Sequence, residues 1–402
     1  MALNVKVGLI GLLDMLKFAN LAKKREQYIN SMPAEEIKAD YPINNFAKAM
    51  HPDYQPLTVD EIIDHKAAGA KTFIFRRSDG KPASYFRAGQ YISLKLPIGD
   101  SFVTRPYSIS SSPKQALEGK LAVTIRTNPG GFAADYMLEN LKVGDEIKGS
   151  EGLGSFFYEQ YRDAKHVVAL AGGSGITPFL SMACAIRDGI EDFKLTILCG
   201  SRSEEVILFK DEFDKIMAET DKVKVVHVLS DEQKDGYENG FITADLIKKY
   251  AGDEPYSIFI CGPEAMYRFV DKEVAKLGLE KKYIRQEFLG ATKTVWEHEG
   301  YPADKKDQVF KLTVKQGPNE TVCDCSANEP ILVAIERAGI KAPSRCRSGE
   351  CGWCRSRVES GEVFIPAETD GRRWGDKQSK EIHPCATFAL SDITIIVPGE
   401  YY

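Results

Sequence analysis

The chain has 402 residues, of which 43% are hydrophobic and 28% charged, and this composition predicts a globular protein of roughly two to four domains. The net charge of −5 and the pI near 5.9 argue against a dedicated nucleic-acid-binding protein. No signal peptide and no uncharged apolar run of about 18 residues is visible, so neither secretion nor a transmembrane helix is expected. The nine cysteines, an odd number, predict a cytoplasmic protein whose thiols serve metal or redox chemistry.

Residues 1–56 are predicted to form an N-terminal helical extension. Apolar residues recur on one helical face near its start, namely Leu9, Leu12, Leu13 and Leu16. Prolines then interrupt the segment. Packing of this helix on the next domain is the favoured interpretation. Docking to a partner protein is less favoured. Contact of residues 1–30 with a membrane surface is the least favoured, because the basic charge beside the apolar face is modest.

Residues 57–158 are predicted to form a small antiparallel β-barrel. Short alternating runs follow one another between Gly, Pro and Asp turns: KTFIFRR, QYISLKLPI, RPYSIS, KLAVTIRT and DEIKGSEG. Within this region, TIRTNPGG leads into the helix-like FAADYML. A helix that begins after such a turn offers free N–H groups and the positive end of its dipole to a phosphate. Arg105 of the RPYS run can pair with the same phosphate region in a bidentate manner.

The RPYS run and the glycine-rich turn resemble the ferredoxin–NAD(P)+ reductase superfamily, whose flavin motif is R-x-Y-S. The resemblance implies that Tyr107 stacks on the flavin ring and that Ser108 acts as a catalytic residue beside the reactive nitrogen. FAD is preferred to FMN, because most of the superfamily uses it. Ala133 and Ala134 stand where the family often has Ser or Thr, so backbone N–H groups are expected to hold the phosphates. The expected flavin-binding residues are Arg105, Pro106, Tyr107, Ser108, Arg126, Gly130, Gly131, Phe132, Ala133 and Ala134.

Residues 159–290 are predicted to form an α/β nucleotide-binding domain. Continuous apolar runs such as HVVALA and YSIFICG alternate with helix-like segments, which indicates a parallel sheet with helical crossovers. After the first run comes G-x-G-x-x-P, a variant of the dinucleotide fingerprint. A packed glycine turn without a ligand is the alternative interpretation. The expected nucleotide-binding residues of this turn are Gly173, Ser174, Gly175, Ile176, Thr177 and Pro178.

A second nucleotide segment, CGPEAM, follows another apolar run. The family resemblance implies that Cys261 positions the nicotinamide for hydride transfer, whereas without the resemblance a core cysteine at the end of a strand is the favoured interpretation. Cys261, Gly262, Pro263 and Met266 are therefore expected beside the nicotinamide. Ser201 and Arg202 follow the second strand, where the adenosine ribose is expected. NADH and NADPH both stay open, with a slight preference for NADH.

Residues 291–308 show no periodicity and many charges, so they are interpreted as a flexible linker that lets the last domain dock or swing. Residues 309–402 contain C-x4-C-x2-C and a later cysteine, the spacing of plant-type [2Fe–2S] proteins. The predicted cluster ligands are Cys346, Cys351, Cys354 and Cys385. A structural zinc site is the alternative, although zinc more often takes paired C-x2-C units. Cys323 and Cys325 fall outside the pattern and are expected to be ordinary strand residues.

The whole stretch around the cysteines resembles plant-type ferredoxin, which implies an α+β, β-grasp domain. The order of barrel, nucleotide domain and C-terminal ferredoxin resembles reductases of the same superfamily. It implies that electrons pass from NAD(P)H through flavin and a [2Fe–2S] cluster singly to a partner redox protein. The alternative is a self-sufficient reductase of a small acceptor such as a quinone or ferric chelate.

Overall fold

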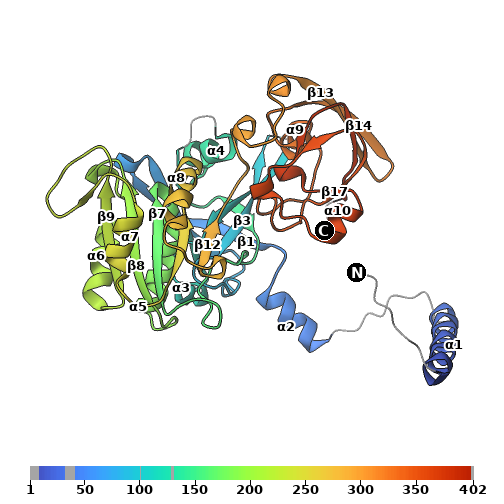
Figure 1. Ribbon diagram of the computed structural model, residues 1–402, viewed down its shortest axis with the longest axis horizontal. Helices are drawn as coiled ribbons and strands as arrows, with labels where there is room; N and C mark the ends of the chain where they lie inside the picture. The colour runs from blue at the N-terminus through green and yellow to red at the C-terminus, as the bar shows by residue number, and fades with distance from the viewer. Residues whose placement is uncertain (1–8, 32–40, 100, 128–130, 400–402) are drawn as a thin grey trace. The chain divides into compact units, whose positions relative to one another are not determined.

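The computed structural model describes residues 9–31, 41–99, 101–127 and 131–399 (Figure 1). The chain divides into two compact units, Met1–Ala47 and Lys48–Tyr402. The leucine-rich start is helical, as helix α1 (Leu9–Ser31), and helix α2 follows (Pro42–Met50). No helix within these described ranges is both long and apolar enough to cross a membrane.

An antiparallel six-stranded sheet forms the first domain of the larger unit. Its strand order is β4-β3-β6-β1-β2-β5, and a bridge between Ile109 and Val123 brings the end of β4 to β5, so that the sheet curls toward closure. Inward-facing aliphatic and aromatic side chains fill the interior. The strands are β1 (Gln55–His65), β2 (Ala70–Arg77), β3 (Tyr91–Ile98), β4 (Ser101–Ser108), β5 (Lys120–Arg126) and β6 (Glu146–Gly149), with helices α3 (Pro113–Leu117) and α4 (Phe132–Asn140) between them.

A parallel six-stranded sheet with the order β10-β9-β8-β7-β11-β12 forms the second domain. Alternate residues of its central strand pack into two different cores, Val167 and Ala169 with helices α5 and α6, and Val168 and Leu170 with α7 and α8. Burial on both faces explains the continuous apolar runs. The strands are β7 (His166–Gly172), β8 (Lys194–Ser201), β9 (Val223–Leu229), β10 (Glu238–Asn239), β11 (Tyr256–Cys261) and β12 (Ile284–Glu287), and the helices are α5 (Thr177–Arg187), α6 (Lys210–Glu219), α7 (Ala244–Ala251) and α8 (Glu264–Ala275).

A five-stranded mixed sheet, β14-β13-β19-β15-β17, and helix α9 (Ile331–Arg337) form the third domain. Ile331, Ala334 and Ile335 of α9 pack on the sheet. Helix α10 (Trp374–Gln378) and a two-stranded sheet, β16 (Val363–Phe364) with β18 (Phe388–Ala389), complete it. The predicted combination of antiparallel barrel, parallel α/β domain and β-grasp domain is therefore confirmed. The main-sheet strands are β13 (Val309–Gln316), β14 (Asn319–Ser326), β15 (Ser356–Ser360), β17 (Glu381–Ile382) and β19 (Ile393–Ile396).

Short 3-10 turns connect many of these elements: η1 (Lys66–Ala68), η2 (Gly173–Ile176), η3 (Glu204–Val206), η4 (Lys281–Tyr283), η5 (Val295–Glu297), η6 (Ala303–Lys305), η7 (Ala367–Thr369) and η8 (Pro384–Ala386). Two of them, η5 and η6, lie in the segment interpreted above as a flexible linker.

The segment 291–308 is packed, which differs from the expectation of a flexible linker. Thr292 Oγ1 donates a hydrogen bond to Glu264 Oε1 of helix α8 at 2.7 Å. Val295 is fully buried in a small core with Tyr301 and Phe388 of the third domain. The Thr292 hydrogen bond attaches the segment to the second domain, and the buried Val295 and Tyr301 attach it to the third. The many charges of the segment obscured these two isolated apolar residues.

Candidate flavin, nucleotide and iron–sulfur sites

The RPYS run lies at the end of strand β4. Ser108 is 7% exposed and pairs in register with Tyr91 of β3. Tyr107 packs against the barrel core, and burial raises the pKa of its phenol to about 12. Pro106 pairs in register with Ser93. A half-buried phenol ring that stays neutral suits stacking against a planar apolar ring.

Arg105 lies where the barrel meets the third domain. Its Nη1 donates to the Thr104 carbonyl at 2.9 Å and lies 3.6 Å from Glu336 Oε2 of helix α9. Glu336 also pairs with both terminal nitrogens of Arg347, at 2.6 and 3.0 Å. Burial, and then the Arg347 charge, lower the pKa of Arg105 to about 10. Two guanidiniums against one carboxylate leave a net positive charge, which suits a phosphate group.

Helix α4 begins directly after Gly131, which provides no side-chain cap. The first N–H groups of α4 are therefore without a capping side chain and available to an anion. Ala133 is buried in the barrel core, while Phe132 is 61% exposed. Ala134 packs beside the same core. Gly130 lies outside the described residues.

Arg126, at the end of β5, reaches the glycine turn of the second domain. A Cβ atom on Gly173 would lie 2.7 Å from Arg126 Nη1, and Gly173 has a φ of +53°, which favours glycine. The structure thus brings a residue expected at the flavin next to a residue expected at the nucleotide. Both predicted sites open onto the same junction.

The two nucleotide motifs are in backbone contact at the carboxyl ends of β7 and β11. A Cβ atom on Gly175 would lie 2.1 Å from the Cys261 carbonyl oxygen. A Cβ atom on Gly172 would lie 2.5 Å from the Met266 sulfur and 3.0 Å from Pro263. At Gly175 the clash is with backbone, so only glycine fits there, and the two loops form one narrow cradle. Ser174, Ile176, Thr177 and Pro178 continue the turn into helix α5, where Thr177 Oγ1 donates to the Ser174 carbonyl at 2.9 Å.

Ser201 ends strand β8, and Arg202 follows it with an exposed side chain. Their carbonyls accept hydrogen bonds from the backbone of Ser230 and Asp231, both at 3.0 Å. These two hydrogen bonds hold Ser201 and Arg202 at the carboxyl end of the sheet, where ligands of parallel α/β folds bind. Arg202 has no ion-pair partner among the residues that the structure describes.

A buried carboxyl group lies beside the predicted hydride-transfer residues. Glu287 of β12 pairs in register with Cys261, and its Oε2 has no hydrogen-bond partner among the described residues. Burial raises the pKa of Glu287 well above its usual range, and Glu350 and Cys346 add to the rise. Burial likewise raises the pKa of Cys261, so this thiol stays neutral. Glu287 was not among the predicted site residues.

The four cysteines expected to bind the cluster lie close together in the third domain. Cys354 Sγ and Cys385 Sγ are 3.4 Å apart. Hydrogen bonds from the Cys351 and Cys385 thiols hold the pKa of Cys346 well below its usual range. Four backbone N–H groups point at these sulfurs at 3.3–3.5 Å, donated by Ser348, Gly349, Cys351 and Trp353. Convergent thiols with N–H donors suit an iron–sulfur cluster. Cys323 and Cys325 lie on β14 and pack in the domain core instead.

The loop that carries Cys346, Cys351 and Cys354, which we call the cysteine loop, turns sharply at three residues with positive φ. Arg347, Gly349 and Gly352 have φ values of +59°, +82° and +71°. A Cβ atom on Gly349 would lie 2.2 Å from the Thr369 carbonyl oxygen, so only glycine fits there. The amide of Gly290, just beyond β12, donates to the Cys346 carbonyl at 3.4 Å. The cysteine loop therefore touches the end of the strand that carries Glu287.

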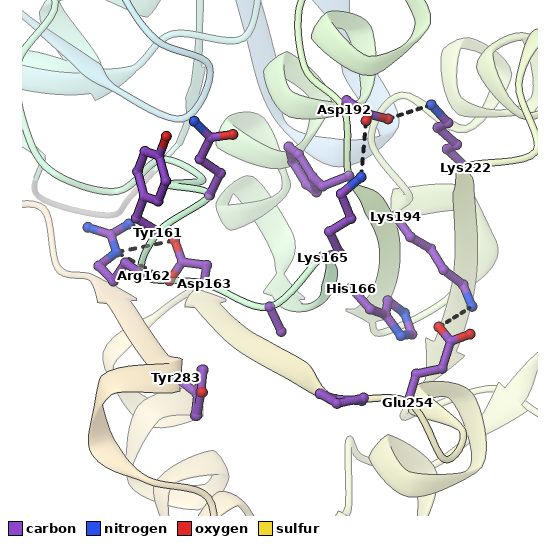
Figure 2. Close-up of a pocket in the computed structure, with 14 residues that line it drawn as sticks. Tyr161, Arg162, Asp163, Lys165, His166, Asp192, Lys194, Lys222, Glu254 and Tyr283 are labelled. Carbon is purple, nitrogen blue, oxygen red and sulfur yellow. Dashed lines mark hydrogen bonds and ion pairs between the residues drawn. The ribbon is translucent and has the colours of Figure 1, made fainter.

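A pocket of about 600 Å³ lies elsewhere. It is lined by the first residues of the parallel strands, including His166 and Lys194, at the edge opposite the glycine turn. Figure 2 shows its lysines paired, with Lys165 and Lys222 reaching Asp192. Ligands of parallel sheets bind at the carboxyl ends of the strands, so we assign no part of the predicted sites to this pocket.

Comparison with family models matches three successive segments. Residues 59–158 match an oxidoreductase FAD-binding domain, residues 169–272 an oxidoreductase NAD-binding domain, and residues 314–390 a 2Fe-2S iron-sulfur cluster binding domain. The phthalate dioxygenase reductase structure superimposes with a TM-score of 0.61 and 23% identity, covering 86% of this chain and 98% of that one. This match shows the shared fold.

Curated relatives agree with the family models. The glycine betaine monooxygenase reductase subunit of Chromohalobacter salexigens is 25% identical over 81% of this chain and 90% of its own length. The ferredoxin reductase component of the 3-ketosteroid-9-alpha-monooxygenase of Mycobacterium tuberculosis is 28% identical over 76% and 86%. NADH-cytochrome b5 reductase 1 of Candida glabrata is 30% identical over 56% of this chain and 79% of its own length. The chain belongs to the ferredoxin–NAD(P)+ reductase superfamily with a C-terminal plant-type [2Fe–2S] domain, and it is an NAD(P)H-dependent oxidoreductase that uses FAD.

Proposed function

We propose that this protein is the reductase component of an oxygenase system, and that it delivers electrons to a separate oxygenase protein. The names of relatives such as the glycine betaine monooxygenase reductase subunit support an oxygenase as acceptor. The observation that carries the proposal is the contact between Gly290 and Cys346, which seats the cysteine loop at the end of β12. When bound, the FAD receives a hydride and the cluster passes its electrons on singly.

The flavin is held by residues of the barrel in this proposal. Arg105 supplies positive charge to the phosphates, and the backbone of 130–134 donates hydrogen bonds to them. Tyr107 and Pro106 line the flavin ring, and Arg126 lines the side facing the nucleotide turn. The Ser108 hydroxyl donates a hydrogen bond at the reacting edge. The uncapped start of α4 and the excess positive charge around Glu336 support this assignment.

The nicotinamide nucleotide lies in the cradle between the two glycine motifs in this proposal. Residues 173–178 follow the pyrophosphate, and 261–263 with Met266 flank the nicotinamide. The neutral Cys261 thiol acts by packing and does not form a bond, because its raised pKa disfavours the thiolate. Ser201 and Arg202 contact the adenosine ribose. NADH stays the slightly preferred donor, and a cytoplasmic location fits its supply.

The four cysteines 346, 351, 354 and 385 hold the cluster in this proposal. Their thiolates bind the iron atoms, and the N–H donors around them stabilise the negative charge of the sulfurs. We further propose the domain boundaries 57–158, 159–290 and 309–402, joined by 291–308. Strand β13 begins at Val309, which supports the last boundary, whereas β1 begins at Gln55, two residues before the first proposed boundary.

The variant Cys354→Ser in the full chain tests the proposed route. A serine weakens the cluster site without a large change in volume, because the side chain keeps its shape. We expect NADH-driven reduction of ferricyanide to persist, because the flavin can reduce this small acceptor, while reduction of cytochrome c is lost. Equal persistence of both activities would favour a reductase that serves small acceptors from the flavin. The matched control is Cys323→Ser on β14, which should retain both activities and the cluster absorbance.

A further inference from the structure

The cysteine loop has one buried arm and one exposed arm. Residues 344–348 are between 3% and 5% exposed. Cys346 of this arm accepts from Gly290, and Arg345 Nη2 donates to the Asp53 carbonyl at 3.4 Å. On the other arm, Cys351 and Trp353 are exposed. The loop therefore faces the first two domains with one arm and solvent with the other.

A second segment, residues 369–378, runs along the exposed arm. A Cβ atom on Gly371 would lie 2.6 Å from the Gly349 carbonyl oxygen, which shows how closely the backbones approach. Asp376 Oδ1 accepts from Arg355 Nη1 at 2.8 Å, and Asp376 Oδ2 accepts from the Arg373 amide at 2.9 Å. Helix α10 is thus fixed beside the cysteine loop by an acidic residue that faces inward.

Two acidic side chains on this surface, Asp370 and Asp376, are largely buried, while Glu350 beside Cys351 is exposed. Asp376 is 8% exposed and Asp370 is 16% exposed, and both are paired with neighbouring cations. Trp374 is 77% exposed. Cations and tryptophans point outward together, and we call this surface the exit face: Trp353, Arg355, Arg373, Trp374, Lys377 and Lys380.

Neither Arg373 nor Lys380 takes part in an ion pair within the described part of the chain. Their charges are therefore available to another molecule. Exposed tryptophan and arginine are the residues that contribute most to protein–protein binding energy. An outward cationic surface attracts carboxylates across an interface and accelerates association. Trp374 contributes little to the domain core, so its exposure points to a role outside the fold.

We propose that the exit face docks the electron-accepting protein, and that this partner presents an acidic surface to it. The inference rests on the proposed function and names the chemistry of its partner. Docking here brings the acceptor to the exposed arm of the cysteine loop, while the buried arm faces the flavin and nucleotide domains. Electrons then reach the cysteine loop on its buried arm and leave it on its exposed arm.

Two forms of one acceptor probe the charge of this face in the full holoprotein. Native cytochrome c is basic, and its succinylated form is acidic because each modified lysine carries a carboxylate. NADH-driven reduction of each form is measured at about 20 mM and about 300 mM salt, since screening grows over this range. We expect faster reduction of the succinylated form, with a rate that falls as salt rises. Carbodiimide cross-linking to Lys377 or Lys380, located by mass spectrometry, reports binding without turnover.

The test variant is Arg373→Glu with Lys380→Glu, because these two side chains support no ion pair. We expect reduction of the succinylated form at low salt to slow about tenfold and the salt dependence to disappear or reverse. The control is Lys248→Glu with Lys272→Glu, an equal charge change on exposed positions of α7 and α8. Trp374→Ser should slow both forms of cytochrome c, independent of salt.

Equal rates for the two forms, or an unchanged rate in the Arg373→Glu, Lys380→Glu variant, would overturn the acidic-partner proposal. Retained cluster absorbance in the variant separates such a result from misfolding. A failure of the proposed function looks different. In that case ferricyanide is reduced while neither form of cytochrome c is reduced, in the unaltered chain as well as in the variants.

Discussion

Glu336 of helix α9 lies 3.6 Å from Arg105 of strand β4, and it binds Arg347 of the cysteine loop at the same time. One carboxylate thus joins the barrel residue expected at the flavin phosphates to the residue that follows Cys346, the first of the proposed cluster ligands. All three side chains are largely buried, since Glu336 is 10% exposed, Arg347 6% and Arg105 22%. Such a contact fixes the third domain on the barrel, in contrast to a domain that swings freely.

Replacing Glu336 by Gln should loosen this junction. Two buried guanidiniums lose their counter-charge, and breaking a buried pair costs about 3 kcal/mol. We expect a lower melting temperature and faster hydrogen exchange in α9 and the cysteine loop, measured by mass spectrometry. Cytochrome c reduction should slow more than ferricyanide reduction. The control Glu329→Gln removes the partner of Arg337 on the same domain, away from the barrel. Equal exchange in the two variants would contradict a special role for Glu336.

Glu287 should make the protein less stable as pH rises. Its pKa in the folded state is raised by burial, so the folded protein holds this proton more firmly than the unfolded chain does. Stability is therefore lost as pH rises from the ordinary glutamate range, about 4.3, toward the raised folded value. Glu287→Gln removes the free-energy cost of ionising this buried carboxyl group as pH rises. We expect the variant to gain at least about 2 °C in melting temperature over the wild type at pH 8, and much less at pH 5.

Glu205→Gln, a change on an exposed residue, provides the comparison for Glu287. This variant should show the same difference in melting temperature between pH 5 and pH 8 as the wild type. A gain from Glu287→Gln that is the same at both pH values would mean that the carboxyl group is not protonated in the folded protein.

The local motifs could be predicted from the sequence because each lies within a short stretch. The cysteines of CRSGECGWC and the glycines of GGSGITP have fixed spacings that only a few structures use. Strand β1 was not among the predicted runs. A bulge between Val59 and Glu61 breaks its alternation, so the pattern QPLTVDEIIDH reads poorly as a strand. Glu336 and Glu287 were missed because their partners lie far away in sequence, and pairing across domains leaves no periodic signal.

The packed segment 291–308 leads to a prediction about proteolysis. Glu264 accepts from Thr292 and Thr294 of this segment, at 2.7 and 3.2 Å, and the neighbouring Lys293 is exposed. Glu264→Ala removes both contacts, so the backbone near Lys293 should open more often and trypsin should cut there several-fold faster. The control Glu280→Ala removes only an exposed pair with Lys282 and should not change the rate. Equally fast cleavage of the wild-type chain would restore the flexible-linker interpretation.

Gly175 offers a test of the nucleotide cradle that leaves the other cofactors in place. An added Cβ would lie 2.1 Å from the Cys261 carbonyl, which is backbone and cannot move aside without shifting the CGPEAM segment. Gly175→Ala should therefore weaken NADH binding at least about tenfold, because small displacements of reacting groups are costly. Flavin and cluster absorbance should persist. Titration of flavin reduction with NADH gives the affinity.

Gly200→Ala is the matched control on the adjacent strand, since its added Cβ would meet nothing closer than 3.6 Å. Equal loss in both variants would show that the sheet, and not the cradle, had been disturbed.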